Sequence, residues 1–243
     1  IFSNAWLDEN IRSHGPLGAL YERKRWMDEG DNPAWMQVIP NGLSDPTQPW
    51  QGDWGGRTKQ EPTKNLRSAR YYILNQKHGT QPESNFYDFY IYDDGTDRWR
   101  YEGTTYNNIY APIFRWREDY QNDFAARMDW SVRAQANHNP QVVLQGDDTK
   151  QVILQRANSG DTITLDASGT SDPDGNNLRY EWFTYPEAGT YSGDVTLQNT
   201  NKQQAQLKVP RDATRKDIHV ILRVTDTGNP PLTSYRRLVV RGK

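Results

Sequence analysis

The sequence predicts an α/β fragment followed by an all-β, immunoglobulin-like sandwich. Short segments in which apolar and polar residues alternate recur after about position 160, as expected for strands with one buried face. Eight of the nine tryptophans precede position 131. Between the two parts lies a polar stretch, QANHNP (135–140), which ends in proline and is typical of a linker. We therefore predict one domain over residues 1–136 and a second over residues 137–243.

Composition narrows the possible functions. The chain has 243 residues, and 12% of them are aromatic, which favours a folded chain over a disordered one. The formal net charge is −2, with no block of like charges, so neither nucleic acid nor an anionic membrane is the expected partner. Cysteine is absent, which excludes disulfides and thiolate metal sites. No apolar run is long enough for a membrane span, so we expect none.

The first part reads as mixed helical and irregular. Ser3 is placed to cap a short helix, and Pro16 suits the first position of a second helix. That second helix would carry, on one face, Leu17, Leu20, Tyr21 and Met27.

The middle of the chain reads as extended segments around a long loop. WMQVIP (35–40) is expected to be a short buried strand. Residues 41–62, rich in Gly, Pro, Asp and Trp, predict a long ordered loop of the kind that often carries function. Residues 71–74 and 86–92 read as further extended segments. Asn122 is then expected to cap a helix that carries, at helical spacing, Phe124, Met128 and Val132.

The second part shows strand periodicity throughout. Alternating segments occur at 162–167, 178–182, 205–209, 220–224 and 235–240. About seven short strands in roughly one hundred residues is the pattern of a two-sheet sandwich. Trp182 is the expected aromatic centre of its core.

Two sets of motifs resemble known families. LDASGTSDPDGNNLRYEW (165–182) and VILRVTDTG (220–228) resemble the polycystic-kidney-disease-type and cadherin-like sandwiches of secreted and surface proteins. A second set resembles a bacterial family of cellulose-binding proteins, in which a nucleoside hydrolase-like domain precedes a C-terminal sandwich. The motifs of this second set are HGPLG (14–18), IPNGLSDP (39–46), WGGR (54–57), QNDFAARMDW (121–130) and YPEAGTY (185–191).

The second resemblance implies that residues 1–136 are the C-terminal part of a nucleoside hydrolase-like domain. In that fold an N-terminal Asp-rich loop binds Ca²⁺ and supplies the catalytic base, and such a loop is not found in this sequence. The chain begins at Ile1 and carries no signal peptide, so we expect it to start inside a longer reading frame. A missing N-terminal half, possibly a separate chain, would then be a partner. The family implies a secreted, periplasmic or cell-surface location.

Two groups of residues are candidate metal ligands. The resemblance implies that Asp123 completes a calcium site, with Asn122 touching substrate; the alternative is that both residues only stabilise a helix start. Asp172 and Asp174, in an SDPDG turn, could hold a second Ca²⁺ ion, or could serve ordinary turn chemistry.

Three further residues are candidate substrate contacts. Trp50 and Trp54 in the long loop could stack on sugar faces, or could pin the loop by packing. His14 could contact substrate, or could be a hydrogen-bonded structural histidine.

Two function classes follow. The first is part of a secreted hydrolase acting on a carbohydrate or nucleoside-like glycoside, with Ca²⁺-activated water and a base from the missing segment. The alternative is a non-catalytic module that binds a cellulose-like polysaccharide. A structural subunit of an assembly is a third possibility.

Overall fold

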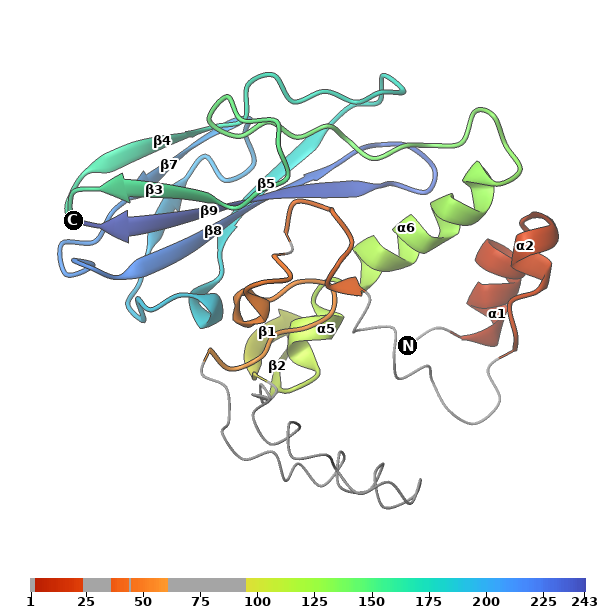
Figure 1. The fold of residues 1–243 in the computed structure, drawn as a ribbon, viewed down its shortest axis with the longest axis horizontal. Coiled ribbons are helices and arrows are strands. Elements are labelled where there is room, and N and C mark those ends of the chain that lie inside the picture. Colours follow the sequence, from red (N-terminus) through yellow and green to blue (C-terminus); the bar gives the residue numbers. More distant parts are fainter. Residues whose placement is uncertain (1–2, 24–35, 44, 61–94) are drawn as a thin grey trace, which may run out of the picture.

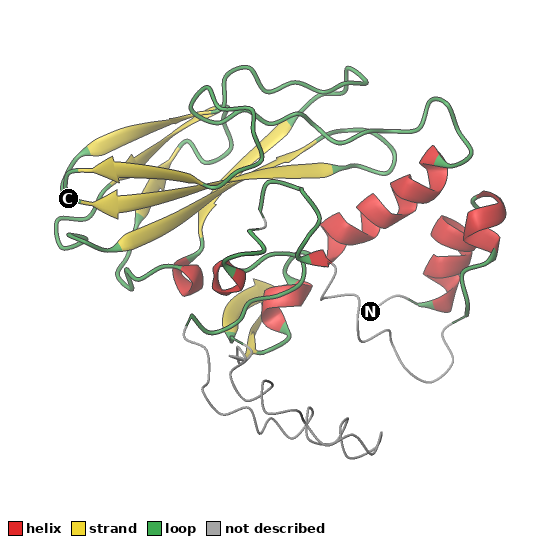
Figure 2. Ribbon diagram, in the orientation of Figure 1, coloured by secondary structure: helices red, strands yellow, loops and turns green. Residues whose placement is uncertain are grey.

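The computed structural model describes residues 3–23, 36–43, 45–60 and 95–243. A β-sandwich forms one end of the molecule, the helices α1 and α2 lie at the other, and a small hairpin with α5 lies below the sandwich (Figures 1 and 2). A four-stranded sheet has the order β3-β9-β8-β5, and a three-stranded sheet has the order β4-β7-β6. All pairs are antiparallel except the parallel pair β3 and β9. The strands are β3 (Ile153–Ala157), β4 (Thr162–Asp166), β5 (Arg179–Thr184), β6 (Thr196–Gln198), β7 (Gln204–Lys208), β8 (Asp217–Thr225) and β9 (Thr233–Gly242).

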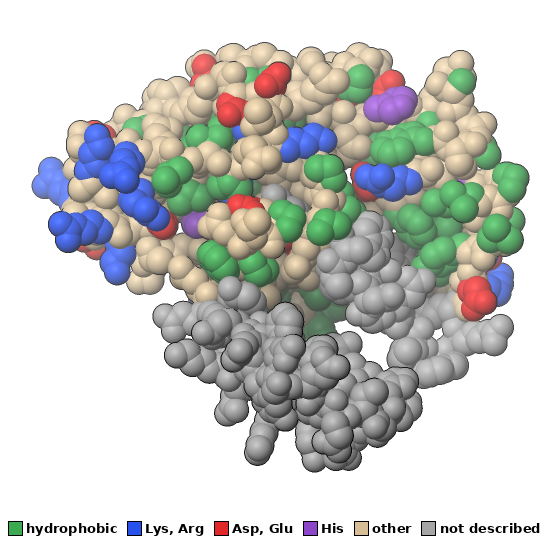
Figure 3. All heavy atoms as spheres, in the orientation of Figure 1, with side chains coloured by type: hydrophobic (Ala, Val, Ile, Leu, Met, Phe, Trp, Pro, Cys, Tyr) green, Lys and Arg blue, Asp and Glu red, His purple; other side chains and the backbone are tan. Residues whose placement is uncertain are grey.

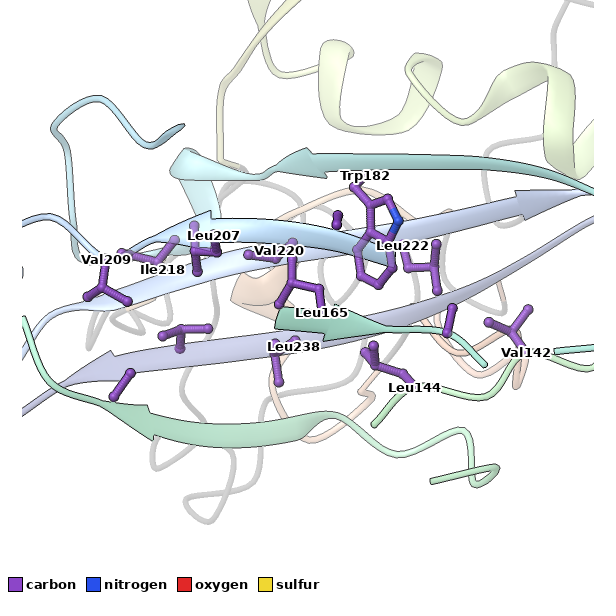
Figure 4. Close-up of a cluster of buried hydrophobic side chains, with 14 of the residues drawn as sticks. Val142, Leu144, Leu165, Trp182, Leu207, Val209, Ile218, Val220, Leu222 and Leu238 are labelled. Carbon is purple, nitrogen blue, oxygen red and sulfur yellow. The ribbon is translucent and has the colours of Figure 1, made fainter. Parts of the chain in front are cut away.

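The space between the two sheets is filled by the inward-facing residues of the alternating segments (Figure 4). Leu165 and Leu207 come from one sheet, and Leu222 and Leu238 from the other. Trp182 is 2% exposed, and its indole N–H donates to the carbonyl of Lys202 at 2.8 Å. The predicted sandwich and its central tryptophan are therefore confirmed, because period-two alternation places every second side chain on the same face.

The four-stranded sheet is covered on both faces. On the strand β8, Val220 and Leu222 face the sandwich core, while Ile221 faces the opposite way and joins a second apolar cluster. That second cluster unites the two parts of the chain: Leu43, Trp54, Trp116, Tyr120, Tyr185, Ala188, Ile221 and Tyr235. The aromatic residues of the first part thus complete a core on the outer face of the sandwich.

The elements of the first part are short. They are α1 (Asn4–Leu7), the π-helical turn η1 (Asp8–Arg12), α2 (Gly15–Ala19), the 3₁₀ turn η2 (Pro49–Gln51), β1 (Asp97–Tyr101), β2 (Thr104–Asn108), α5 (Ala111–Phe114) and α6 (Arg117–Trp130); a further 3₁₀ turn, η4 (Pro186–Ala188), follows β5. Among the described residues, no helix is both long and apolar enough to cross a membrane.

The first two helices follow the predicted caps but not the predicted length. The Ser3 hydroxyl accepts a hydrogen bond from the Trp6 N–H at 3.0 Å, and Pro16 lies in the first turn of α2. The helix nevertheless ends at Ala19, and Leu20 is 79% exposed. Gly18 is the buried residue of α2. It packs so closely that a Cβ there would lie only 1.9 Å from the Ile11 carbonyl oxygen. Close backbone contact, rather than a leucine face, therefore holds α2; Met27 lies outside the described residues.

Two further expectations for the first part are corrected. Residues 36–40 form a turn instead of a strand: Ile39 N–H donates to the Met36 carbonyl at 3.3 Å, and Val38 is 61% exposed. The expected helix cap at Asn122 is also wrong, because α6 already begins at Arg117 and Asn122 lies in its middle. Burial of Trp116 immediately before this helix sets its start. Trp35 and the expected segments 71–74 and 86–92 lie outside the described residues.

Candidate functional site

A cleft lies where the hairpin of β1 and β2 meets the start of α6. Its volume is about 190 Å³. One wall is aromatic and the other is charged. The lining residues are Trp99, Tyr101, Phe114, Arg115, Arg117, Glu118 and Arg223.

The hairpin places its aromatic side chains on one face. Trp99 and Tyr101 are two residues apart on β1, and Tyr106 pairs directly with Trp99 across the hairpin. The ring centroids of Trp99 lie 5.0 Å from those of Tyr101 and 5.5 Å from those of Tyr106. The turn uses Glu102 and Gly103, both with positive φ, which matches the right-handed twist of a two-residue hairpin loop. The result is a row of three rings beside the cleft, in which Trp99 stacks on Tyr101 and is tilted against Tyr106.

Charged side chains line the opposite wall. The Arg117 guanidinium lies 5.7 Å from the centre of the Tyr101 ring, and the Tyr101 hydroxyl donates to Glu118 at 3.4 Å. The negative charges of Glu102 and Glu118 raise the pKa of Tyr101, so this hydroxyl stays protonated at neutral pH. Arg223 donates to Glu181 at 3.2 Å and to the buried Asp119. Aromatic surface beside donors and acceptors is the combination that suits a sugar, which has both C–H faces and hydroxyl groups.

A buried carboxylate fixes the hairpin to the sandwich. Asp97, the first residue of β1, has no exposed surface. It accepts hydrogen bonds from Arg57 at 2.7 Å, from Arg115 at 3.1 Å and from the Tyr185 hydroxyl. Burial and the Asp97 charge raise the pKa of Tyr185. This network holds the aromatic wall in place relative to α5 and the sheet.

The predicted Asp123 and Asn122 lie side by side in the middle of α6. Asp123 is 4% exposed, accepts a hydrogen bond from Arg127 at 2.6 Å and another from Asn139 at 3.5 Å. An i, i+4 arginine therefore neutralises this carboxylate in the structure. Asn122 lies inside α6, where backbone N–H groups are paired within the helix, so it does not cap the helix.

The predicted turn carboxylates are also hydrogen-bonded. Asp172 accepts from the N–H groups of Asp174 and Asn176, each at 3.0 Å, as in an Asx-type turn. Asp174 accepts from the His138 N–H at 2.7 Å. No group of three or more His, Cys, Asp or Glu side chains among residues 3–23, 36–43, 45–60 and 95–243 is arranged to hold a metal ion. Calcium at Asp123, Asp172 or Asp174 stays a prediction.

His14 is held on both ring nitrogens. Nδ1 lies 2.6 Å from the Asp129 carboxylate, and Nε2 lies 3.0 Å from the Glu9 carbonyl. These contacts tie the start of α2 to the end of α6, which is the structural alternative for this residue.

The two loop tryptophans have different surroundings. Trp54 is 1% exposed and packs edge-on against Tyr120 and Tyr235, with its N–H donating to the Tyr235 hydroxyl at 3.3 Å. Its ring belongs to the core, so stacking on a sugar would require that core to open. Trp50, on η2, is only partly buried. The sequence did not predict Trp99, Tyr101 or Tyr106 as contacts. The available signal was the alternation of aromatic residues with other residues before the Gly-containing turn at 102–103.

Comparison with protein-family models gives two matches. Residues 1–58 match the nucleoside hydrolase-like domain of the cellulose-binding protein Sde182, and residues 162–242 match the C-terminal domain of the cellulose-binding protein Sde0182. No curated protein matches the chain.

Comparison with solved structures gives a similarity over the whole chain. It is to a nucleoside hydrolase-related hypothetical protein from Saccharophagus degradans that is associated with carbohydrate metabolism, with 36% identity and a TM-score of 0.80. The alignment covers 100% of this chain and 55% of that protein, so the chain spans about half of its relative's length.

Two other solved structures align with part of the chain. The PKD domain from the KIAA 1837 protein is 21% identical over 42% of this chain and 87% of its own, with a TM-score of 0.29. Protocadherin gamma C5 EC1-3 is 18% identical over 45% of this chain and 34% of its own, also with a TM-score of 0.29.

Proposed function

The chain belongs to the Sde0182 family of cellulose-binding proteins, and on that premise we propose that it binds a cellulose-like polysaccharide in the cleft between the β1–β2 hairpin and α6. The family supports a carbohydrate ligand. An insoluble polysaccharide lies outside the cell, so a secreted, periplasmic or cell-surface location is part of the same proposal.

The observation that supports this site is the aromatic stack beside paired polar groups. The rings of Trp99, Tyr101 and Tyr106 offer apolar surface to the C–H face of a sugar. Glu118 and Arg117 lie next to Tyr101. Glu118 offers an acceptor, and Arg117 offers donors, to the hydroxyl groups of the sugar. Because Asp97 ties β1 to the sandwich, the cleft is held open before a ligand arrives, and less ordering entropy is lost on binding.

Retention on microcrystalline cellulose tests the site. Trp99→Ala is expected to lower the partition coefficient about tenfold, and Trp99→Phe to restore part of it, because a smaller ring keeps part of the apolar contact. Tyr191→Ala is the matched control, since Tyr191 belongs to the sandwich, where its hydroxyl donates to Asp212 at 2.9 Å. Trp50→Ala tests the long loop as a second contact. Wild-type retention by Trp99→Ala would contradict the proposed cleft.

Hydrolysis is the second candidate function. The match of residues 1–58 to a nucleoside hydrolase-like domain favours it. In this hypothesis Asp123 helps to hold Ca²⁺, and an upstream segment, in the same or a separate chain, supplies the base that activates water. Binding would require Asp123 to exchange Arg127 for the cation.

Calorimetric Ca²⁺ titration of the chain joined to its upstream segment tests this hypothesis. Asp123→Asn keeps the shape of the side chain but removes its charge, and it is expected to weaken Ca²⁺ binding at least tenfold. Asp161→Asn, on an exposed turn of the sandwich, is the control. Identical titrations for Asp123→Asn and the wild type would remove Asp123 from any calcium site.

A further inference from the structure

The end of the sandwich opposite the helices carries a concentration of positive charge. Figure 3 shows Lys and Arg side chains gathered at the end of the molecule where Figure 1 marks the C-terminus. They come from the ends of β3 and β9, from β7, and from the loop between β7 and β8. We call this set the basic end: Arg156, Lys208, Arg211, Arg215, Lys216, Arg241 and Lys243.

Backbone hydrogen bonds hold the basic end together. The Arg215 N–H donates to the Gly242 carbonyl at 2.9 Å, and the Gly242 N–H donates to the Lys216 carbonyl at 3.2 Å. The Lys243 N–H donates to the Ala157 carbonyl at 2.8 Å. The backbone positions that carry the cations of the loop and of the last strand are therefore fixed relative to one another, although the formal net charge of the whole chain is −2.

Few of these charges are neutralised locally. Arg241 forms a two-bond ion pair with Asp217, at 2.6 and 2.7 Å. Of the other carboxylates at this end, Asp212 accepts from the Tyr191 hydroxyl, and Asp161 from the Asn158 side chain. Within the described part of the chain, the remaining cations make no ion pair: Arg156, Lys208, Arg211, Arg215, Lys216 and Lys243.

Arg215 occupies a conformation that its side chain does not favour. Its φ of 58° is in the left-handed region, where glycine or asparagine costs less. The loop therefore holds a cation at a position where glycine would cost less. Its side chain is exposed at the tip of the loop, beside the exposed Lys216.

We propose that the basic end binds an acidic polysaccharide, a polymer of uronic acids. Clustered guanidinium and ammonium groups attract closely spaced carboxylates, and arginine pairs with a carboxylate through two parallel hydrogen bonds. This end of the described structure consists of loops and strand ends and has no helix that could enter a groove of duplex nucleic acid, which favours the polysaccharide. The site is separate from the cleft and does not rest on cellulose binding.

Affinity electrophoresis in gels containing polygalacturonate tests the proposal with the chain as it stands. Strong retardation is expected at about 20 mM salt and little at about 300 mM, because screening shortens the reach of exposed charges. The triple variant Arg211→Gln, Arg215→Gln, Lys216→Gln is expected to bind at least tenfold more weakly. Lys202→Gln, which removes an exposed cation from the β6–β7 turn at the other end of the strands, is the matched control and is expected to bind like the wild type.

A second variant separates charge from folding. Arg215→Gly keeps the left-handed turn and removes one cation, so binding is expected to fall about threefold while the urea midpoint does not decrease. Hydroxyethylcellulose gels report on neutral polysaccharide, and the triple variant is expected to migrate there like the wild type whether or not the cleft binds. The proposal is overturned by absence of retardation in polygalacturonate at low salt, by full retardation of the triple variant, or by equally strong binding of duplex DNA.

Discussion

The Tyr235 hydroxyl donates a hydrogen bond to the Asp119 carboxylate and so joins the last strand of the sandwich to the long helix before it. Arg223 and Thr233 donate to the same carboxylate. Burial raises the pKa of both Asp119 and Tyr235, and the Asp119 charge raises that of Tyr235 further, which keeps the phenol protonated as a donor. The two parts of the chain share this polar centre as well as an apolar core.

Removing the Tyr235 hydroxyl tests that connection. Tyr235→Phe leaves the ring in place but deprives a buried carboxylate of one donor, so the free energy of unfolding is expected to fall by about 1–3 kcal/mol. Tyr191→Phe removes a hydroxyl whose partner, Asp212, is exposed, and serves as the control with no measurable change. Urea denaturation followed by tryptophan fluorescence measures both. Equal midpoints for the two variants would show that the Tyr235–Asp119 bond adds no net stability.

Arg237 anchors the long loop to the sheet. It is fully buried, and its donors reach the carbonyls of Leu43, Gln51 and Gly52. Arg237→Lys keeps the charge but can satisfy only part of this set, so a loss of at least ~2 kcal/mol is expected. Limited proteolysis should then cut residues 45–60 faster than in the wild type. Arg241→Lys, in an ion pair at the exposed end of the same strand, is the control. Unchanged cleavage in Arg237→Lys would mean that other contacts hold the loop.

His219 makes the fold sensitive to acid. Its Nδ1 faces the Arg237 guanidinium at 3.1 Å and must accept, so the ring is neutral; burial and the Arg237 charge lower its pKa to about 3. Since the unfolded state takes up a proton below about pH 6.5 and the folded state does not, this contribution to stability is present at neutral pH and is lost as pH falls toward 3. His219→Gln keeps an acceptor without titrating. Between pH 4 and 6, the free energy of unfolding of His219→Gln should rise with pH less steeply than that of the wild type, by up to ~1.4 kcal/mol per pH unit. Parallel curves for the two proteins would exclude His219 as the source of acid sensitivity.

Asp53 changes the stability of the fold with pH in the direction opposite to His219. Burial raises its pKa to about 6, although the Gly55 N–H donates to it at 2.7 Å and Arg237 lies near. The folded state therefore holds a proton that the unfolded state has lost between about pH 4 and 6, and this contribution disappears as pH rises through that window. Asp53→Asn retains the acceptor for Gly55, so its stability should rise more steeply with pH than that of the wild type, by ~3 kcal/mol in total. Chemical denaturation at a series of pH values measures the difference. In the double variant with His219→Gln the two opposite effects should largely cancel, so its curve should run nearly parallel to that of the wild type. A single-variant curve that tracks the wild type would show that Asp53 does not titrate in this window.

The local elements of the fold could be predicted where one property decides them. Period-two alternation located the strands around Leu165, Trp182, Leu207, Leu222 and Leu238, and hydroxyl capping located the helix start after Ser3. The start of α6 could not be predicted in this way, because it depends on Trp116 packing against residues distant in sequence, such as Tyr235.

The candidate site also combines features that the sequence predicts with features that depend on tertiary packing. Trp50 and Trp54 have the composition of a sugar-binding loop, yet Trp54 lies in the core because the sheet beneath it offers a buried surface. The cleft instead uses Trp99 and Tyr101, whose neighbours across the cleft, Arg117 and Glu118, belong to another element. Such neighbours become visible only when the chain is folded.

The sequence by itself determined the sandwich, its central tryptophan and the family motifs, since these follow from short-range periodicity and from runs of adjacent residues. Only the tertiary structure decided that the outer face of β8 and β9 is a second core shared with the first part. The physical reason is that alternation over 235–240 indicates one buried face of the strand, whereas burial of Tyr235 and Arg237 on the other face depends on aromatic rings, carbonyls and carboxylates that are distant in the sequence.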